Sequence, residues 1–212
     1  KNYYKKSEKK IGPKLNFAVS GNNLIVADSI AKIYSIDTVS GDLLWSKSND
    51  YPINSEIKVY KNNFFVVDYK NTLRCFNIND GSECWNVPTE NSLTISGSKY
   101  SVIISKDLVI FNNSIGDITA VNISTGLINW QLPTQSSNII NESYSFINSQ
   151  LVADENSIYF SNNRSEFYSV DLAKGVIKWT HKINSTLTPI LINDLIFTIS
   201  EDGFLITIQK KQ

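Results

Sequence analysis

Histidine, cysteine and methionine are scarce in this sequence, which contains one histidine, two cysteines and no methionine. A zinc site or a histidine-based catalytic pair needs several ligating or proton-transferring partners, and His181 has no second histidine to serve as one. We expect His181 to be an ordinary strand residue. The absence of methionine, even at position 1, predicts that the chain is a processed or excised piece of a longer product.

Long apolar runs are also missing. No stretch approaches the roughly 18 apolar residues that a membrane-spanning helix requires, and the first residues contain no signal-peptide core. The sequence therefore predicts no transmembrane segment. With 42% apolar residues in 212 positions, however, the chain is able to bury a substantial core.

The charge is balanced overall but unevenly distributed. Lysine and arginine together number 20, as do aspartate and glutamate. Six of the lysines lie in residues 1–14 beside the single acidic residue Glu8, so the remainder of the chain is mildly acidic. A nucleic-acid-binding domain would need a basic face, and this function is disfavoured. Residues 1–14 are interpreted as a poorly ordered basic segment, or alternatively as a contact for acidic lipids or an acidic partner.

One arrangement of residues returns four times along the chain. An apolar, β-forming run ends in Asp or Asn, a glycine follows four positions later, and a tryptophan follows four positions after the glycine. The glycines are 40, 45 and 49 residues apart, and all four tryptophans occupy this slot. The four copies are Asp37–Gly41–Trp45, Asn77–Gly81–Trp85, Asn122–Gly126–Trp130 and Asp171–Gly175–Trp179. Such a period indicates an array of supersecondary units.

Each copy predicts a β-hairpin. Asp or Asn can accept hydrogen bonds from backbone N–H groups of a turn, and glycine supplies the positive φ that closes the loop. On a four-residue loop from Thr38 to Gly41, Asp37 pairs with Asp42. The third position of the strand before each turn is small: Ser35, Cys75, Ala120 or Ser169. We expect that gap to receive a tryptophan from a neighbouring unit, as an anchor between units.

The rest of the chain divides into short strands with turns between them. The expected strands are 15–20, 23–29, 31–37 and 43–48; then 56–60, 64–69, 73–78 and 84–87; then 100–105, 108–112, 117–123 and 127–132; then 149–153, 157–161, 166–172 and 176–182; and finally 189–192, 195–200 and 204–209. Four antiparallel strands per repeat indicate an all-β protein built of β-propeller blades, four complete and one partial, over residues 15–212. A seven- or eight-bladed ring is favoured over a five-bladed ring closed by the N-terminal segment.

The two cysteines fall in the second hairpin. In the register of an unbroken hairpin, Cys75 lies directly opposite Cys84, where a cross-strand disulfide is geometrically feasible and would indicate an oxidising compartment. The alternative is a buried thiol at Cys75 with an unrelated cysteine opposite. Both interpretations remain open at the level of sequence.

The repeat resembles the PQQ-like propeller repeat, whose blades combine an apolar-aromatic-Ala-apolar-Asp strand with a Thr-Gly turn and a tryptophan. The matching stretches include Ile33 to Asp37 with Gly41 and Trp45, and Ile118 to Asn122 with Gly126 and Trp130. Among proteins with this repeat, the chain looks most like the BamB-type lipoproteins of the bacterial outer-membrane β-barrel assembly machinery. That resemblance implies a non-enzymatic periplasmic scaffold that binds the β-barrel assembly complex, with peripheral or lipid-anchored membrane association and no cofactor.

Enzymes of the same superfamily supply the alternative. A resemblance to quinoprotein dehydrogenases would imply a quinone, a calcium ion and a catalytic carboxylate, for which Asp37 and Asp171 are the candidates in the repeat. Turn formation explains both of these residues, and Asn77 and Asn122 replace them in the other copies, which acid–base chemistry would not tolerate. We therefore expect no catalytic, metal-binding or cofactor-binding residues. A generic ligand-sensing or interaction propeller is the third interpretation.

Two long connections are the expected protruding loops. Residues 89–99 and 134–148 are polar, and Tyr144 and Phe146 stand in the second as candidate anchors for a protein partner. The alternative is that these segments fold back onto the edges of the blades.

Overall fold

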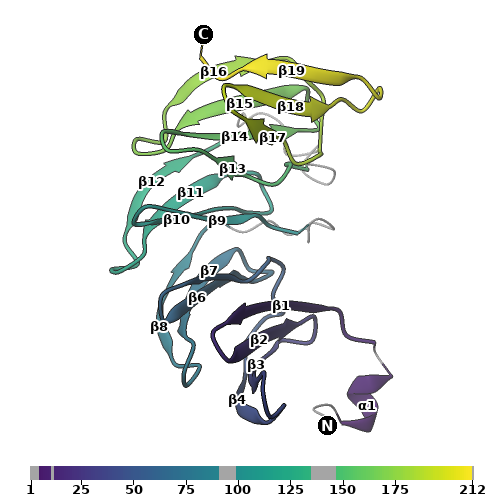
Figure 1. Cartoon of the computed structure of the whole chain (residues 1–212), viewed down its shortest axis with the longest axis vertical. Coiled ribbons are helices and arrows are strands. Elements are labelled where there is room, and N and C mark those ends of the chain that lie inside the picture. Colours follow the sequence, from purple (N-terminus) through teal and green to yellow (C-terminus); the bar gives the residue numbers. More distant parts are fainter. Residues whose placement is uncertain (1–4, 11, 91–98, 135–146, 212) are drawn as a thin grey trace. The chain divides into compact units, whose positions relative to one another are not determined.

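A computed structural model of the chain describes residues 5–10, 12–90, 99–134 and 147–211. The chain forms two compact units, Lys1–Thr89 and Glu90–Gln212. Within the described residues the secondary structure consists of antiparallel strands and one short helix, α1 (Lys6–Lys9), as Figure 1 shows. No helix in this part of the chain has the length and hydropathy needed to cross a membrane.

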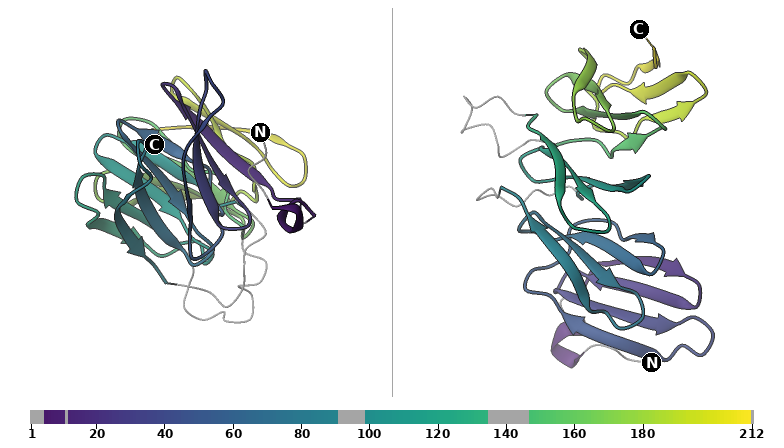
Figure 2. Two further views of the ribbon diagram at one scale, coloured as in Figure 1. Left: turned by 90° about the horizontal axis from the view of Figure 1, so that it is seen from below. Right: turned by 90° about the vertical axis from the view of Figure 1, so that its left-hand side faces the viewer.

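The first unit contains two four-stranded sheets, each with its strands in chain order. The first sheet consists of β1 (Leu15–Ser20), β2 (Asn23–Asp28), β3 (Lys32–Asp37) and β4 (Leu43–Ser48). The second consists of β5 (Lys58–Tyr60), β6 (Asn63–Val67), β7 (Thr72–Asn77) and β8 (Glu83–Pro88). A core that includes Ile25, Ile33, Phe64 and Phe76 lies between them, and the second view in Figure 2 shows the sheets face to face.

The second unit contains two further four-stranded sheets and one of three strands among the residues that the structure describes. They are β9 (Val102–Ser105), β10 (Leu108–Asn112), β11 (Ile118–Asn122) and β12 (Ile128–Leu132); β13 (Val152–Ala153), β14 (Ser157–Asn162), β15 (Glu166–Asp171) and β16 (Ile177–His181); and β17 (Ile190–Ile192), β18 (Leu195–Ile199) and β19 (Leu205–Gln209). The predicted all-β blade architecture is confirmed.

The middle strands of the four-stranded sheets are largely buried on both faces, which explains their nearly continuous apolar sequences. All five residues of β10 and all six of β14 are buried. The fourth strands are more exposed, and β4 alternates only between exposed and half-buried positions. The core therefore runs through the centre of each sheet and continues into the next sheet of the same unit.

The first strands β5, β9 and β13 begin two or three residues later than the sequence predicts, and in β5 and β13 a serine hydroxyl is the reason. The Ser55 Oγ accepts a 2.8 Å hydrogen bond from the Val67 N–H, and the Ser149 Oγ accepts one of 2.9 Å from the Ser161 N–H. In each case a side chain occupies the place of a backbone carbonyl in the ladder. The ladder resumes only at Lys58 and at Val152.

The turn between the second and third strands repeats as faithfully as the glycine turn, although the sequence analysis did not identify it. Asp28, Asp68, Asn113 and Asn162 each accept hydrogen bonds on Oδ1 from the backbone N–H groups two and four residues later. The residue in between adopts positive φ at Ala31, Asn71, Gly116 and Ser165. Because only one of these four is a glycine, no glycine periodicity reveals the turn.

The basic N-terminal segment is attached to the first sheet through α1. Glu8 lies 2.8 Å from the Lys32 Nζ and also accepts a hydrogen bond from the Lys5 N–H. These contacts, of which the one from Lys32 is the strongest, lower the pKa of the Glu8 carboxyl group. The boundary at residue 15 coincides with the start of β1. Poor order in residues 1–14 stays a prediction, because residues 1–4 and 11 lie outside the described part of the chain.

Candidate binding surface and the tryptophan contacts

The four Asp and Asn residues of the repeat shape the turn between the third and fourth strands. The backbone N–H groups of Gly41, Gly81, Gly126 and Gly175 donate to the carbonyl oxygen of their Asp or Asn at 2.8–3.0 Å. The side chains contribute a second set of bonds: the Asp37 Oδ1 accepts from the Val39 and Ser40 N–H groups at 2.8 and 2.7 Å. Asn122 makes the same pair of bonds with an amide oxygen at 3.0 Å each. A carboxylate and an amide are thus equivalent here.

The two carboxylates of the repeat have lowered pKa values for the same reason. Hydrogen bonds from the Ser40 and Val39 backbone N–H groups lower the pKa of Asp37. Burial acts to raise the pKa of Asp171, but bonds from the Lys174 backbone and the Lys178 side chain outweigh it and lower the pKa. Asp37 is held ionised by its turn, and Asp171 by its turn together with Lys178, which makes both poor general acids or bases near neutral pH.

The tryptophans sit next to a β-bulge in every complete sheet. The register shifts by one residue between the third and fourth strands, so that each tryptophan lies opposite the small residue of its own sheet. The pairs are Ser35–Trp45, Cys75–Trp85, Ala120–Trp130 and Ser169–Trp179. The expectation that the small residue admits a tryptophan from another unit was wrong, because the bulge brings the indole of the same sheet over it.

Two tryptophans pack on the glycine turn of the next sheet. The Trp45 Nε1 donates to the Ile78 carbonyl at 2.8 Å, and a Cβ on Gly81 would lie only 2.6 Å from the Trp45 ring. The Trp130 Nε1 likewise donates to the Leu172 carbonyl at 3.0 Å, with Gly175 beneath its ring. The glycine is needed twice, once for its positive φ and once because the indole leaves no room for a side chain.

The cysteines do not face each other as an unbroken hairpin would require. Cys75 pairs with Trp85, and Cys84 is the additional residue of the bulge between Glu83 and Trp85. Cys75 is buried and Cys84 is exposed, and both carry free thiols in this structure. The prediction that Cys75 lies directly opposite Cys84 was wrong, because the bulge that positions Trp85 shifts the register by one residue.

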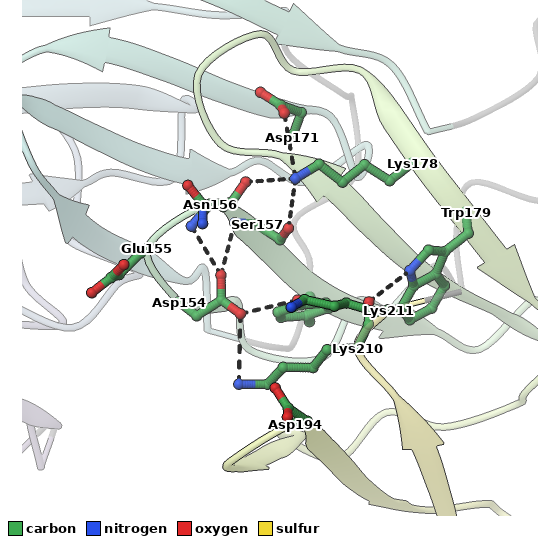
Figure 3. A pocket seen from close by; sticks show the side chains of 11 residues that line it. Asp154, Glu155, Asn156, Ser157, Asp171, Lys178, Trp179, Asp194, Lys210 and Lys211 are labelled. Carbon is green, nitrogen blue, oxygen red and sulfur yellow. Dashed lines mark hydrogen bonds and ion pairs between the residues drawn. The ribbon is translucent and has the colours of Figure 1, made fainter.

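A polar cleft of about 830 Å³ opens beside Trp179 in the second unit (Figure 3). The Trp179 Nε1 donates to the Lys210 carbonyl at 3.2 Å, which is the counterpart of the Trp45 and Trp130 bonds. The cleft is lined by Asp154, Glu155, Asn156, Ser157, Tyr159, Asp171, Lys178, Trp179, Asp194, Lys210 and Lys211.

Charges in this cleft largely neutralise one another. The Lys178 Nζ contacts the Asn156 carbonyl, the Ser157 Oγ and Asp171 at 2.9, 2.9 and 3.3 Å. The Asp154 Oδ2 accepts from the Tyr159 hydroxyl at 3.0 Å and lies 3.5 Å from the Lys210 Nζ. The Ser157 hydroxyl has a lysine beside it but no histidine. The cleft has the character of a polar contact surface.

Metal-binding clusters of three or more His, Cys, Asp or Glu residues do not occur among the described residues. His181, the single histidine, lies on β16 with its ring 5.0 Å from that of Trp179. The residues of the repeat are brought together in pairs for packing.

The two predicted loops lie mostly outside the described residues, which exclude 91–98 and 135–146 and with them Tyr144 and Phe146. Their first residues are described. The Thr89 Oγ1 donates to the Asn71 carbonyl at 2.8 Å, and the Thr134 Oγ1 donates to the Gly116 carbonyl at 2.8 Å. The start of each loop is therefore hydrogen-bonded to the positive-φ residue of a turn between second and third strands.

Four-stranded antiparallel sheets that follow one another along the chain are the blade architecture of β-propeller proteins. A family model described as "Outer membrane protein assembly factor BamB" matches residues 5–212, and the chain belongs to this family. It is 22% identical over 194 residues to the outer membrane protein assembly factor BamB of Moranella endobia (strain PCIT), covering 90% of this chain and 50% of the relative. The chain thus spans about half the length of that curated relative.

Solved structures support the fold. The BamB structure from Moraxella catarrhalis matches with a TM-score of 0.75 at 17% identity, over 93% of this chain and 60% of that one. A europium-containing methanol dehydrogenase matches with a TM-score of 0.74 at 11% identity, over 93% of this chain and 50% of that one. At such identities these likenesses establish the β-propeller fold and leave function to other arguments.

Proposed function

We propose that the chain is part of a non-enzymatic, periplasmic scaffold that serves outer-membrane β-barrel protein assembly by binding subunits of the assembly complex. The family match over residues 5–212 is the observation that carries this proposal. The relative from Moranella endobia is also named an outer membrane protein assembly factor, which supports the same role. Association with the outer membrane, through a lipid anchor or through a partner, is part of the proposal.

The described polar residues agree with a scaffold because their hydrogen bonds are used for shape. Asp37 and Asp171 hold turns, and Asp154 and Lys178 cross-link neighbouring segments around the cleft. A propeller built in this way presents rigid turns and variable loops at its rims, where a protein partner can bind. The alternative from the same fold is a quinone-dependent oxidoreductase, which the methanol dehydrogenase likeness brings into consideration.

Direct binding tests the proposal. The tagged chain should bind the purified periplasmic domains of the barrel-inserting subunit in biolayer interferometry, while a quinoprotein propeller of the same fold should not. In parallel, the chain is titrated with pyrroloquinoline quinone and calcium and followed by quinone absorbance. Binding of the subunit without binding of the quinone supports the scaffold. Saturable quinone binding together with dye-linked alcohol oxidation would replace it with the enzyme.

A further inference from the structure

The β7–β8 hairpin contains both cysteines of the chain on one face of its sheet. Cys75 pairs with Phe65 of β6 and with Trp85 of β8, and Cys84 is the extra residue of the bulge directly before Trp85. In such a bulge two consecutive residues oppose a single residue of the other strand. Cys84 and Trp85 therefore both oppose Cys75.

An independent contact fixes the direction of the Cys84 side chain. Its Sγ lies 3.7 Å from the Oδ1 of Asn63. Asn63 is two residues before Phe65 on β6, and residues two apart on a strand point to the same face. Since Phe65 pairs with Cys75, the Cys84 sulfur lies over the face on which the Cys75 side chain is buried.

In the sheet of β13 to β16, the side chain at the bulge position also extends toward the second strand of its sheet. Lys178 holds the bulge position there, directly before Trp179, and its Nζ lies 2.9 Å from the Ser157 hydroxyl. Ser157 begins β14 as Asn63 begins β6. The equivalent of Cys75 in that sheet is Ser169. The repeat therefore does not require cysteine at the small position or at the bulge position. Only the second sheet has a cysteine at both positions.

The two thiols differ in accessibility. Cys84 is exposed, whereas the Cys75 side chain is fully buried. Burial raises the pKa of the Cys75 thiol, and the neighbouring Cys84 thiol raises it further. An attacking thiol must be accessible to the oxidant, so the exposed Cys84 is suited to react first and the buried Cys75 to react second.

We propose that Cys75 and Cys84 form a redox pair that closes to an intramolecular disulfide across β7 and β8 when the protein meets a disulfide oxidant. With oxidised glutathione, the Cys84 thiolate attacks one sulfur of the glutathione disulfide and releases one glutathione thiolate. The Cys75 thiolate then attacks the Cys84 sulfur of the mixed disulfide and releases the second. Two protein thiols are oxidised, one glutathione disulfide is reduced to two thiols, and two protons pass from the protein to the products or solvent.

The disulfide would fix the bulge that carries Trp85. The Trp85 ring packs 5.7 Å from the Phe65 ring of the same sheet. A bond between Cys75 and the residue preceding Trp85 restricts the backbone from which that indole projects. This proposal is independent of the proposed role in outer-membrane protein assembly, because it depends only on the geometry of one hairpin.

Mass spectrometry of the folded chain after incubation with oxidised glutathione tests the proposal. We expect the wild-type chain to lose the mass of two hydrogen atoms, its titratable thiols to fall from two to none, and a non-reduced digest to contain a Cys75–Cys84 linked peptide. Cys75→Ser should stop at a mixed disulfide with one glutathione on Cys84. Serine is a suitable replacement because Ser35 and Ser169 occupy the equivalent position in other sheets.

Cys84→Ser provides the complementary control, since its remaining thiol is buried and should stay unmodified in the folded chain. Two results would overturn the proposal. One is a wild-type chain that accumulates the stable mixed disulfide seen in Cys75→Ser. The other is a wild-type chain that retains two free thiols after the Cys84 thiol of Cys75→Ser has reacted completely.

Discussion

At the scale of single residues, the glycines of the repeat all adopt a positive φ, but only some of them must also leave room for a tryptophan ring. Gly41 and Gly81 both adopt φ of +69°. Nothing lies within 4 Å of a Cβ placed on Gly41, whereas the Trp45 ring lies 2.6 Å from one placed on Gly81. The sequence motif treats the two positions as equivalent, although only Gly81 has an indole packed on it in the first unit.

These two glycines supply a matched pair of variants. Gly41→Ala should lower the free energy of unfolding by about 1–2 kcal/mol, from the cost of the left-handed conformation alone. Gly81→Ala should lower it by a further 1–3 kcal/mol or so, because the added methyl group displaces Trp45. Urea denaturation of the first unit measures both. Equal losses in the two variants would show that the Trp45–Gly81 contact does not stabilise the fold.

Asp117 is a residue whose environment no sequence pattern reveals. It is buried just after the turn at Gly116, and desolvation together with the charge of Glu90 raises its pKa to about 6. The folded state thus binds this proton more tightly than the unfolded state. Its contribution to stability is present at low pH and decreases as the pH rises from about 4 to about 6, after which it stays constant.

The Asp117→Asn variant tests this pH dependence. The wild-type chain should lose stability between pH 5 and pH 7.5 relative to the variant, since the amide keeps an acceptor for its hydrogen-bonding neighbours but carries no charge. Urea midpoints at the two pH values provide the measurement, and Asp107→Asn serves as a control for a general change of charge. If the two variants had the same pH profile, the raised pKa of the buried Asp117 carboxyl group would be refuted.

At the scale of elements, the repeated sequence pattern predicts the hairpins but not their bulges. The order of strands and the positions of the turns follow from apolar runs that end at Asp, Asn or Gly. A bulge adds one residue to a strand without changing its composition, so neither the pairing of Ser35 with Trp45 nor the offset of the cysteines was predictable. The shortened β5 and β13 escaped prediction for a similar reason, because nothing in the sequence shows that the Ser55 and Ser149 side chains accept hydrogen bonds in the ladder.

The tryptophans of the second unit should differ in their contribution to stability. The Trp130 side chain is 9% exposed and lies on Gly175, whereas Trp179 is half-buried beside the cleft. Trp130→Ala should lower the free energy of unfolding by about 3–5 kcal/mol, as expected for a large core residue. Trp179→Ala should cost clearly less, and denaturation of the second unit would measure both. The reverse order would contradict the assigned packing.

At the scale of the whole molecule, the sequence predicted the class of fold and the resemblance predicted the family, but the chemistry of the repeat could not locate a partner. The Asp, Asn, Gly and Trp residues that make the repeat recognisable are used in turns and packing. The two loops expected to contact partners differ from each other in sequence and have no periodic pattern, so nothing in their residues indicates what they bind. The family match is therefore the basis of the proposed function, and the structure explains the residues of the repeat through turns and packing.

The most direct test of this account replaces both carboxylates of the repeat at once. Asn122 already performs the turn function with an amide, so Asp37→Asn/Asp171→Asn should keep the turns intact. In bacteria that lack the native protein, the full-length protein carrying both substitutions should restore outer-membrane protein levels to the same extent as the wild type. Failure to restore them, with wild-type urea midpoints for the purified variant, would contradict the account, because it would show that these carboxylates act in function rather than in shape.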